Sequence, residues 1–284
     1  MKLVKRITST AVAVAATTGL LFGGFSYQAK AASSNVVVAG STALLPLTQQ
    51  AKVEYQKTNK DVSISVSGSS SIDGPESVMK GTATIGACDW DATVAQGGFK
   101  AYKELRAYKV AVTPFATIVN KSNKVKNLST KQLQGIFSGK IKNWKEVGGK
   151  DAKIVVVNRK FGSGTRVNFQ AKALKGSKFM TSGNYKEVGK SGEMIASIQS
   201  NPNAIGYVDL AYVDKSVKAL QYNNVSPTVE NVKNGKYPVW GYGYLLTKGA
   251  AKGDNLKFIQ YMQSNKFQNG SLKKLDFVPF KNVK

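Results

Sequence analysis

Residues 154–166 read IVVVNRKFGSGTR, an apolar run followed by a loop of glycine, serine and threonine. The apolar run predicts a buried strand, and the residues from Val167 onward predict a helix. A helix N-terminus carries unpaired backbone N–H groups, and glycines let an anion approach that backbone closely. The stretch therefore predicts a strand, an oxyanion-binding loop and a helix that begins at Val167.

Arginine usage supports this prediction. Only four of the 41 basic residues are arginines, and two of them, Arg159 and Arg166, flank the loop. A guanidinium can grip an oxyanion through two parallel hydrogen bonds, which a lysine ammonium cannot do. We therefore expect the loop to bind an anion through backbone and side chain together.

Two earlier stretches repeat the pattern of strand, polar turn and helix. The first comprises residues 36–38, 40–42 and 44–55, and the second comprises residues 62–66, 68–71 and 72–80. In both, the turn consists mainly of glycine, serine and threonine. Alternating strands and helices predict an α/β fold with mixed, mostly parallel sheets flanked by helices, whose ligands bind at the carboxyl ends of strands.

The chain is predicted to contain an export segment and two lobes. Residues 1–31 combine a basic start, an apolar span and a final Ala-Lys-Ala, which is typical of a cleaved signal peptide. Strand and helix alternate separately on either side of residue 113, which favours two lobes over one. We expect residues 32–113 and 238–284 to form the first lobe and residues 114–237 the second.

The composition excludes several chemistries. The chain has no histidine, which removes the usual general base at neutral pH, Ser-His-Asp triads and most zinc sites. The single cysteine, Cys88, follows an apolar run and is expected to be a buried hydrophobe. We therefore expect a binding protein without catalysis, metal or cofactor, and without a lipid anchor on an N-terminal cysteine.

The formal net charge of +25 leaves more than one explanation open. A strongly basic chain can bind nucleic acid or anionic envelope polymers, and dispersed lysines also keep a surface solvated. The lysines here are dispersed, without an aromatic-studded basic stripe, and the chain is predicted to be exported. Nucleic acid is therefore not expected, whereas anionic cell-wall polymers and a simply solvated surface both remain.

Six motifs, in order along the chain, resemble the phosphate-binding receptors of bacterial phosphate ABC importers. This resemblance covers nearly all of the predicted mature chain and implies a two-lobed periplasmic-binding-protein-like fold of type II, with the ligand in the cleft between the lobes. The motifs are AGST at 39–42, GSS at 68–70, IGACD at 85–89, QGIFSGKIKNW at 134–144, Arg159 with GSGT at 162–165, and NAIGYV at 203–208.

The resemblance also implies which residues would hold phosphate. Arg159 would supply the charge-assisted fork, and Asp89 would accept a proton from the bound ion. The other expected phosphate-binding residues are Thr42, Ala43, Ser69, Ser163, Gly164 and Thr165, and Ser41, Ser70 and Arg166 are expected neighbours.

Asp89 also makes physical sense as a selectivity residue, because phosphate near neutral pH keeps a proton that a carboxylate can accept. Sulfate has no such proton and would be repelled. Three residues depart from the family pattern. Phe161 stands where several relatives carry an acid that orients the arginine, Ala43 replaces a bulkier residue, and Ser71 replaces a glycine.

The function implied is that of a monomeric, extracytoplasmic receptor. It would bind inorganic phosphate between its lobes and deliver it to the membrane subunits of an ABC permease. Such a protein could be periplasmic, secreted or held at the cell wall by its lysines. Two alternatives remain: an envelope-associated protein that binds anionic wall polymers, and a receptor for another oxyanion such as a phosphonate.

Overall fold

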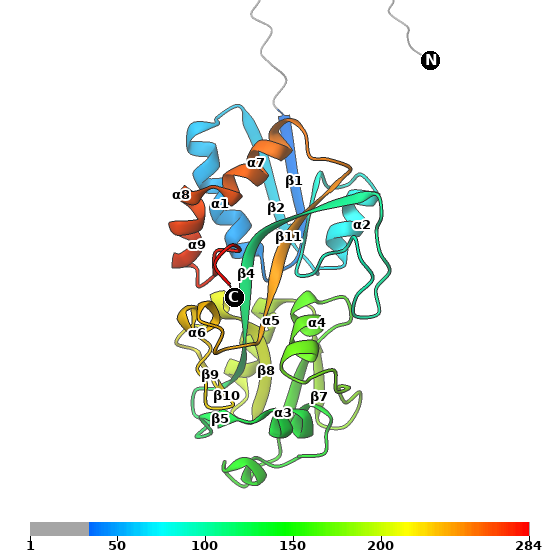
Figure 1. Ribbon diagram of the computed structural model, residues 1–284. Coiled ribbons are helices and arrows are strands. Elements are labelled where there is room, and N and C mark those ends of the chain that lie inside the picture. Colours follow the sequence, from blue (N-terminus) through cyan, green and yellow to red (C-terminus); the bar gives the residue numbers. More distant parts are fainter. Residues whose placement is uncertain (1–33, 284) are drawn as a thin grey trace, which may run out of the picture. The chain divides into compact units, whose positions relative to one another are not determined.

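A computed structural model describes residues 34–283, so the predicted signal peptide lies outside the described residues. The described residues lie within one compact unit. A nine-stranded mixed sheet runs through it (Figure 1). In sheet order the strands are β2 (Val62–Gly68), β1 (Ser34–Gly40), β3 (Ile85–Cys88), β11 (Trp240–Lys248), β4 (Leu105–Asn120), β8 (Ala204–Asp209), β6 (Val155–Arg159) and β7 (Tyr185–Val188), with β9 (Val217–Ala219) beside β4.

The sheet contains two groups of parallel strands joined by antiparallel ones. In the first strand group β1 pairs with β2 and β3, and in the second strand group β6 pairs with β7 and β8. The long strand β4 pairs antiparallel with β11 along residues 105–114 and with β8 along residues 115–119. Figure 1 shows β4 and β11 running between the two groups. The predicted α/β fold with a mixed sheet flanked by helices is confirmed. Among the described residues the sheet is not mostly parallel, because β4 and β11 make four antiparallel pairs, as many as the parallel ones.

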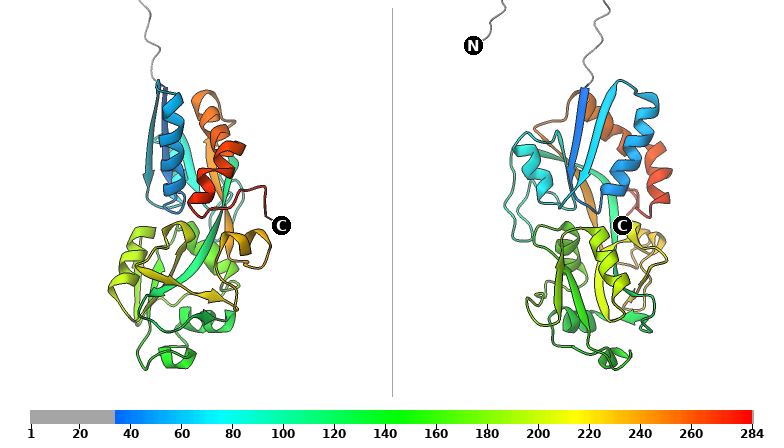
Figure 2. Two further views of the ribbon diagram at one scale, coloured as in Figure 1. Left: turned by 90° about the vertical axis from the view of Figure 1, so that its left-hand side faces the viewer. Right: turned by 180° about the vertical axis from the view of Figure 1, so that it is seen from behind.

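Helices lie on both sides of the strands (Figure 2). The α-helices are α1 (Leu45–Thr58), α2 (Asp73–Met79), α3 (Thr130–Phe137), α4 (Gly164–Lys172), α5 (Ser191–Ser200), α6 (Val229–Lys233), α7 (Gly253–Gln263), α8 (Asn265–Asn269) and α9 (Ser271–Lys274). Two short 3₁₀ helices, η1 (Trp144–Val147) and η2 (Leu210–Tyr212), and a small sheet of β5 (Asn127–Leu128) and β10 (Gln221–Tyr222) complete the described elements.

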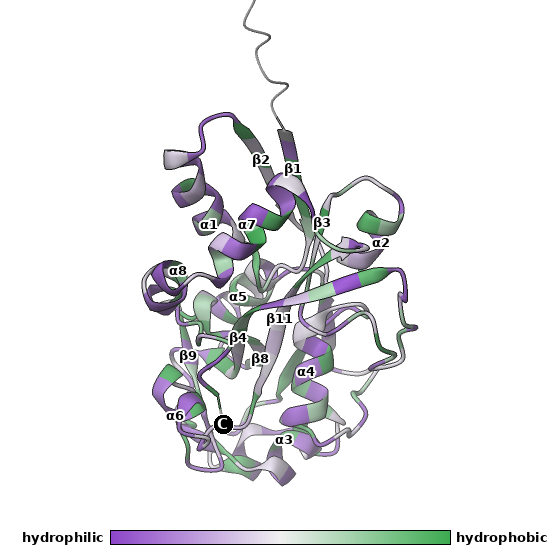
Figure 3. Ribbon diagram, turned by 45° about the horizontal axis from the view of Figure 1, so that its top comes forward, coloured by the Kyte–Doolittle hydropathy of each residue, from purple (hydrophilic) through white to green (hydrophobic). Residues whose placement is uncertain are grey.

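Each strand group has its own hydrophobic packing. Leu47 of α1 and Phe258 of α7 belong to one cluster with Ile85 of β3. Met194 of α5 packs in another cluster with Val208 of β8. Purple hydrophilic and green hydrophobic residues alternate along the helices in Figure 3, as expected for helices with one face in a core. None of the helices within residues 34–283 is both long and apolar enough to cross a membrane.

One predicted boundary is wrong. Helix α4 begins at Gly164 rather than at Val167, because the Ser163 side chain caps it by accepting a hydrogen bond from the Arg166 N–H at 3.3 Å. An N-cap serine satisfies one of the free N–H groups and so extends a helix toward its N-terminus. Gly164 and Thr165 of the predicted anion-binding loop therefore lie in the first turn of the helix.

The predicted lobe boundary between residues 113 and 114 falls inside β4, which is one continuous strand of 16 residues. The two strand groups lie on either side of this point, yet they share one sheet. The division into lobes stays a prediction. The buried position of Cys88, in contrast, is confirmed.

Candidate functional site

Residues from both strand groups meet at the carboxyl ends of their strands. In the first strand group, Ser41, Thr42 and Ala43 follow β1 and Asp89 follows β3. In the second strand group, Arg159 ends β6 and the GSGT loop follows it. Since parallel strands end at a common edge, each set of loops gathers at one edge, and side-chain contacts join the two sets.

Asp89 lies at the centre of the first set and is only 2% exposed. Ser41 Oγ donates a hydrogen bond to its Oδ1 at 2.8 Å, and Ser71 Oγ donates to its Oδ2 at 3.0 Å. Burial raises the pKa of Asp89 to about 6, although these two hydrogen bonds and the charge of Arg159 act in the opposite direction. At neutral pH the carboxylate therefore predominates and can accept a proton.

The N-terminus of α4 lies directly against Asp89. A Cβ atom placed on Gly164 would lie 2.5 Å from both Asp89 Cβ and Ser71 Oγ. Further along the helix, Asn168 Nδ2 donates to the backbone carbonyl of Asp89 at 2.8 Å and to that of Gly164 at 3.0 Å. Only glycine allows this approach, which brings the free N–H groups of α4 beside the carboxylate.

The guanidinium of Arg159 reaches from the second strand group to the first. Its Nη2 donates to Gly189 O at 2.7 Å and to Thr42 Oγ1 at 3.3 Å, and its Nη1 donates to Ser191 Oγ at 3.3 Å. Arg159 is 1% exposed, and its Nε has no hydrogen-bond partner among the described residues. Burial lowers the pKa of Arg159 from its ordinary value, but a guanidinium remains charged in proteins. The site thus contains a buried cation whose Nε–H group can still donate a hydrogen bond.

Two residues outside the expected set contact Thr42, and a third contacts one of them. The Ser191 N–H, in the first turn of α5, donates to Thr42 Oγ1 at 3.3 Å, and Tyr212 Oη donates to the Thr42 carbonyl at 2.8 Å. Ser191 Oγ donates to Asp209 Oδ2 at 3.3 Å. Asp209 is fully buried, and burial together with the charge of Asp89 raises its pKa well above the ordinary value.

A signal in the sequence exists for Asp209 but not for Ser191. Asp209 directly follows the apolar motif at 203–208, so it is an acid at the end of a buried strand, as Asp89 is. Ser191 follows β7, whose sequence YKEV has no apolar run to indicate a buried strand. Its place beside Thr42 depends on the pairing of β7 with β6.

The second turn contributes a different serine from the one expected. Ser69 is exposed and Ser70 is half-buried, whereas Ser71 is buried and donates to Asp89. The structure therefore brings the Ser71 side chain into contact with Asp89, whereas the Ser69 N–H donates to the Gly40 carbonyl at 2.8 Å and its contact with phosphate stays a prediction. The departure from glycine at position 71 has a clear consequence, because the added hydroxyl is the group that contacts the carboxylate.

The remaining expected residues lie close to this cluster. The Ala43 N–H donates to Ser41 Oγ at 3.0 Å, and Thr165 is buried in the first turn of α4. Arg166 donates to the Arg159 carbonyl at 2.6 Å and forms an ion pair with Glu187 at 3.0 Å. Arg166 thus supports the backbone of Arg159, and its charge is partly balanced by Glu187.

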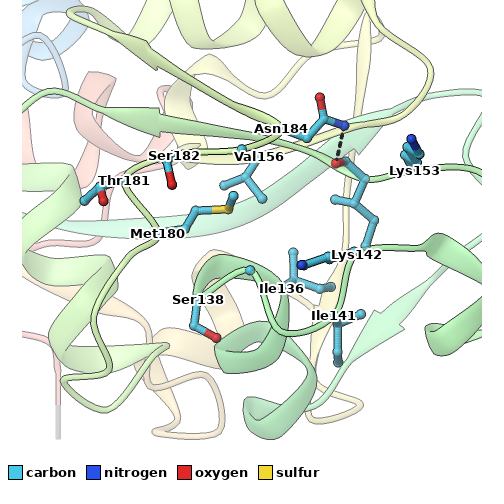
Figure 4. A pocket seen from close by; sticks show the side chains of 13 residues that line it. Ile136, Ser138, Ile141, Lys142, Lys153, Val156, Met180, Thr181, Ser182 and Asn184 are labelled. Carbon is cyan, nitrogen blue, oxygen red and sulfur yellow. Dashed lines mark hydrogen bonds between the residues drawn. The ribbon is translucent and has the colours of Figure 1, made fainter.

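A separate cavity of about 550 Å³ is lined by residues between 136 and 184 (Figure 4). It is bounded by the end of α3, by Lys142 and Lys153, and by residues 180–184. None of the expected site residues lines it. Its walls are held together in part by the hydrogen bond from Asn184 Nδ2 to the Ile154 carbonyl at 2.8 Å.

Comparisons with known proteins give a consistent result. Residues 26–266 match the family model of the PBP superfamily domain. The phosphate-binding protein PstS of Bacillus subtilis (strain 168) is 37% identical over 254 residues, which is 89% of this chain and 83% of that protein. The phosphate-binding protein PstS of Borreliella burgdorferi is 26% identical over 244 residues, which is 82% of this chain and 86% of that protein.

Solved structures agree with these sequence relatives. A structure from Clostridium perfringens with bound phosphate, assigned to the substrate-binding proteins of phosphate ABC transporters, has a TM-score of 0.79 and 33% identity and covers 88% of this chain and 100% of that one. An ABC-type phosphate transport receptor from Vibrio cholerae has a TM-score of 0.67 and 27% identity, covering 86% of this chain and 99% of that one.

Proposed function

From its membership of the PBP superfamily and, within it, of the phosphate-binding proteins of ABC transporters, we propose a function for this chain. It binds inorganic phosphate and delivers it to a membrane permease. One observation carries the proposal for this chain. A buried arginine, a buried carboxylate and a helix N-terminus, from both strand groups, meet in one place. An anion that still carries a proton matches all three groups.

Each group has a distinct task in this proposal. The Arg159 guanidinium and the N–H groups of Ser163, Gly164 and Thr165 bind the charged oxygens of phosphate. The Thr42 hydroxyl and the Ala43 N–H add donors from the first strand group. Asp89 accepts a hydrogen bond from the P–OH group, and the hydroxyls of Ser41 and Ser71 hold its carboxylate in place. Ser71 thus acts through Asp89, and Ser69 remains a proposed phosphate contact from the second turn.

The contacts between the strand groups support binding by closure of two lobes. Thr42 is bonded to Arg159 and to Ser191, so the two sets of loops meet through the residues that would hold the ion. A ligand that bonds to both sides stabilises the closed arrangement by its differential affinity for it. The permease would then distinguish the loaded receptor by its closed shape. No step of this cycle requires catalysis.

The proposed setting is outside the cytoplasm, as a monomer exported by the segment at 1–31. Attachment to anionic wall polymers is supported only by the net charge of +25. Such attachment would be ionic, so the protein should leave isolated cell walls in moderate salt. The relatives do not favour wall binding or phosphonate binding as the main function.

Titration calorimetry of the exported protein, stripped of bound ligand by unfolding and refolding, tests the proposal. We expect micromolar or tighter binding of phosphate and at least about a thousand-fold weaker binding of sulfate, because like charges forced together in a dehydrated site cost several kcal/mol. Absence of phosphate binding by the refolded protein would refute the proposed function. Equal binding of both ions would refute the role of Asp89.

A further inference from the structure

Three aromatic rings form a stack beside the site. The Trp90 and Phe99 rings have centroids 4.8 Å apart and an interplanar angle of 18°, and the Phe99 and Phe161 rings have centroids 4.5 Å apart and an angle of 30°. Trp90 directly follows Asp89, and Phe161 lies two residues after Arg159. The stack therefore begins and ends beside the two charged residues of the site.

The stack connects the two strand groups. Trp90 and Phe99 lie between β3 and β4, whereas Phe161 lies in the loop between β6 and α4. Trp90 is 2% exposed and Phe99 is 9% exposed, so this pair belongs to the packed interior. Phe161 is 69% exposed and stacks on Phe99 from the other strand group. Its ring thus gains its aromatic contact only while the two groups lie together.

The backbone of the same loop makes a second contact across the groups. The Ile72 N–H donates to the Gly162 carbonyl at 3.1 Å, and a Cβ atom on Gly162 would lie 2.6 Å from Ile72 Cγ2. The loop from Lys160 to Ser163 is therefore held from two sides, by Ile72 and by Phe99. Neither contact involves an atom proposed to bind the ion.

We propose that Phe161 and Phe99 are positioning residues that set the affinity for phosphate by slowing its release. This inference rests on the proposed function. Phosphate held between the strand groups leaves only when the groups separate, and separation must break the ring contact. An aromatic pair contributes a modest favourable interaction free energy in addition to that gained by burying the area of its rings. Loss of the pair should therefore raise the release rate and leave the approach of phosphate nearly unchanged.

The test measures phosphate binding and release by stopped flow on the exported protein and its variants. In Phe161→Ala we expect the release rate and the Kd to rise together by about 2- to 10-fold, with the association rate within about twofold of wild type. Phe161→Tyr keeps the ring and should restore release to near the wild-type rate. Val94→Ala is the matched control, because Val94 is an exposed apolar residue of the segment between β3 and β4 that also contains Phe99. This substitution should leave the release rate and the Kd unchanged.

A double-mutant cycle separates the ring contact from a general effect on the loop. If the contact acts as proposed, the double variant Phe99→Leu/Phe161→Ala releases phosphate no faster than whichever single variant binds it more weakly. The ratio of phosphate to sulfate affinity should stay constant in all variants, because neither ring touches the ion.

Additive effects of the two substitutions, or an unchanged release rate in Phe161→Ala, would overturn this inference. These outcomes are distinct from a failure of the proposed function, because they require that the wild-type protein binds phosphate. If the wild-type protein does not bind phosphate, both proposals are wrong.

Discussion

Asp89 is the residue on which discrimination between oxyanions depends. Replacing it with asparagine removes the charge that repels sulfate but keeps an oxygen that can accept a hydrogen bond. We expect Asp89→Asn to lower the ratio of phosphate to sulfate affinity by about tenfold or more, since the like-charge term is lost. Competition calorimetry with the two ions measures the ratio, and an unchanged ratio would show that selectivity comes from elsewhere.

Arg159 is the residue that supplies buried positive charge. Arg159→Lys keeps the charge but loses the planar fork that reaches Thr42, Gly189 and Ser191. We expect phosphate affinity to fall by about tenfold or more, because bidentate contacts to an oxyanion cannot be replaced by an ammonium. Arg106→Lys is the control, because Arg106 is exposed on β4. This variant should bind phosphate like the wild-type protein. Equal affinities of the Arg159→Lys and wild-type proteins would contradict the assignment.

At the residue scale, the sequence predicted those parts of the site that lie in short motifs. Asp89, Arg159 and Gly164 stand at the ends of apolar runs or in glycine-rich loops, where the pattern itself indicates an edge of the sheet. Ser191 could not be predicted, because its place depends on the pairing of a polar strand. Ser71 was noted only as a departure from a glycine, since sequence alone cannot say which of three consecutive serines faces inward.

Among the elements, α4 packs tightly against Asp89 and Ser71 at its N-terminus. Its first residue, Gly164, leaves no room for a methyl group next to Asp89 and Ser71. We expect Gly164→Ala to lower phosphate affinity by at least about tenfold and the free energy of unfolding by about 1–3 kcal/mol, because the helix must shift away from the carboxylate. Calorimetry and denaturant unfolding measure the two effects.

Gly192→Ala provides the matched control for that substitution. Gly192 lies in the first turn of α5, and a Cβ atom there meets nothing within 4 Å. We expect this variant to keep wild-type affinity and to gain up to about 1 kcal/mol of stability from better helix propensity. A similar loss of affinity in both variants would mean that any change in a first helical turn disturbs binding.

The start of α4 also shows where sequence reasoning about elements falls short. Propensity argues against a helix that opens with glycine and threonine, so Val167 was the predicted start. The cap made by Ser163 outweighs that preference. The strand–turn–helix units themselves were predictable, because apolar runs and polar turns alternate clearly. The continuous course of β4 was not, since Pro114 in its middle argues for a break between two short strands.

For the whole molecule, burial of Asp89 has a consequence for stability. Its pKa is raised to about 6 in the folded chain from 3.8, so between these values the folded state binds more protons than the unfolded state. The contribution of Asp89 to the free energy of unfolding therefore increases as the pH falls through 6. Between pH 7 and pH 5 we expect a gain of about 1 kcal/mol in the ligand-free protein relative to Asp89→Asn.

Thermal or urea unfolding in phosphate-free buffer at pH 7, 6 and 5 tests this difference. Comparison with Asp89→Asn is essential, because burial raises the pKa of Asp209 in both proteins, although the part caused by the charge of Asp89 is lost in the variant. Parallel pH profiles of the two proteins would contradict the buried, ionisable state of Asp89.

The account as a whole claims that phosphate binds where the two strand groups meet. A crystal structure of the exported protein grown with phosphate tests this claim most directly. We predict one phosphate ion within hydrogen-bonding distance of the Asp89 carboxylate, the Arg159 guanidinium and the first N–H groups of α4. An ion found only in the cavity near Lys142 and Lys153, with no anion between Asp89 and Arg159, would contradict it.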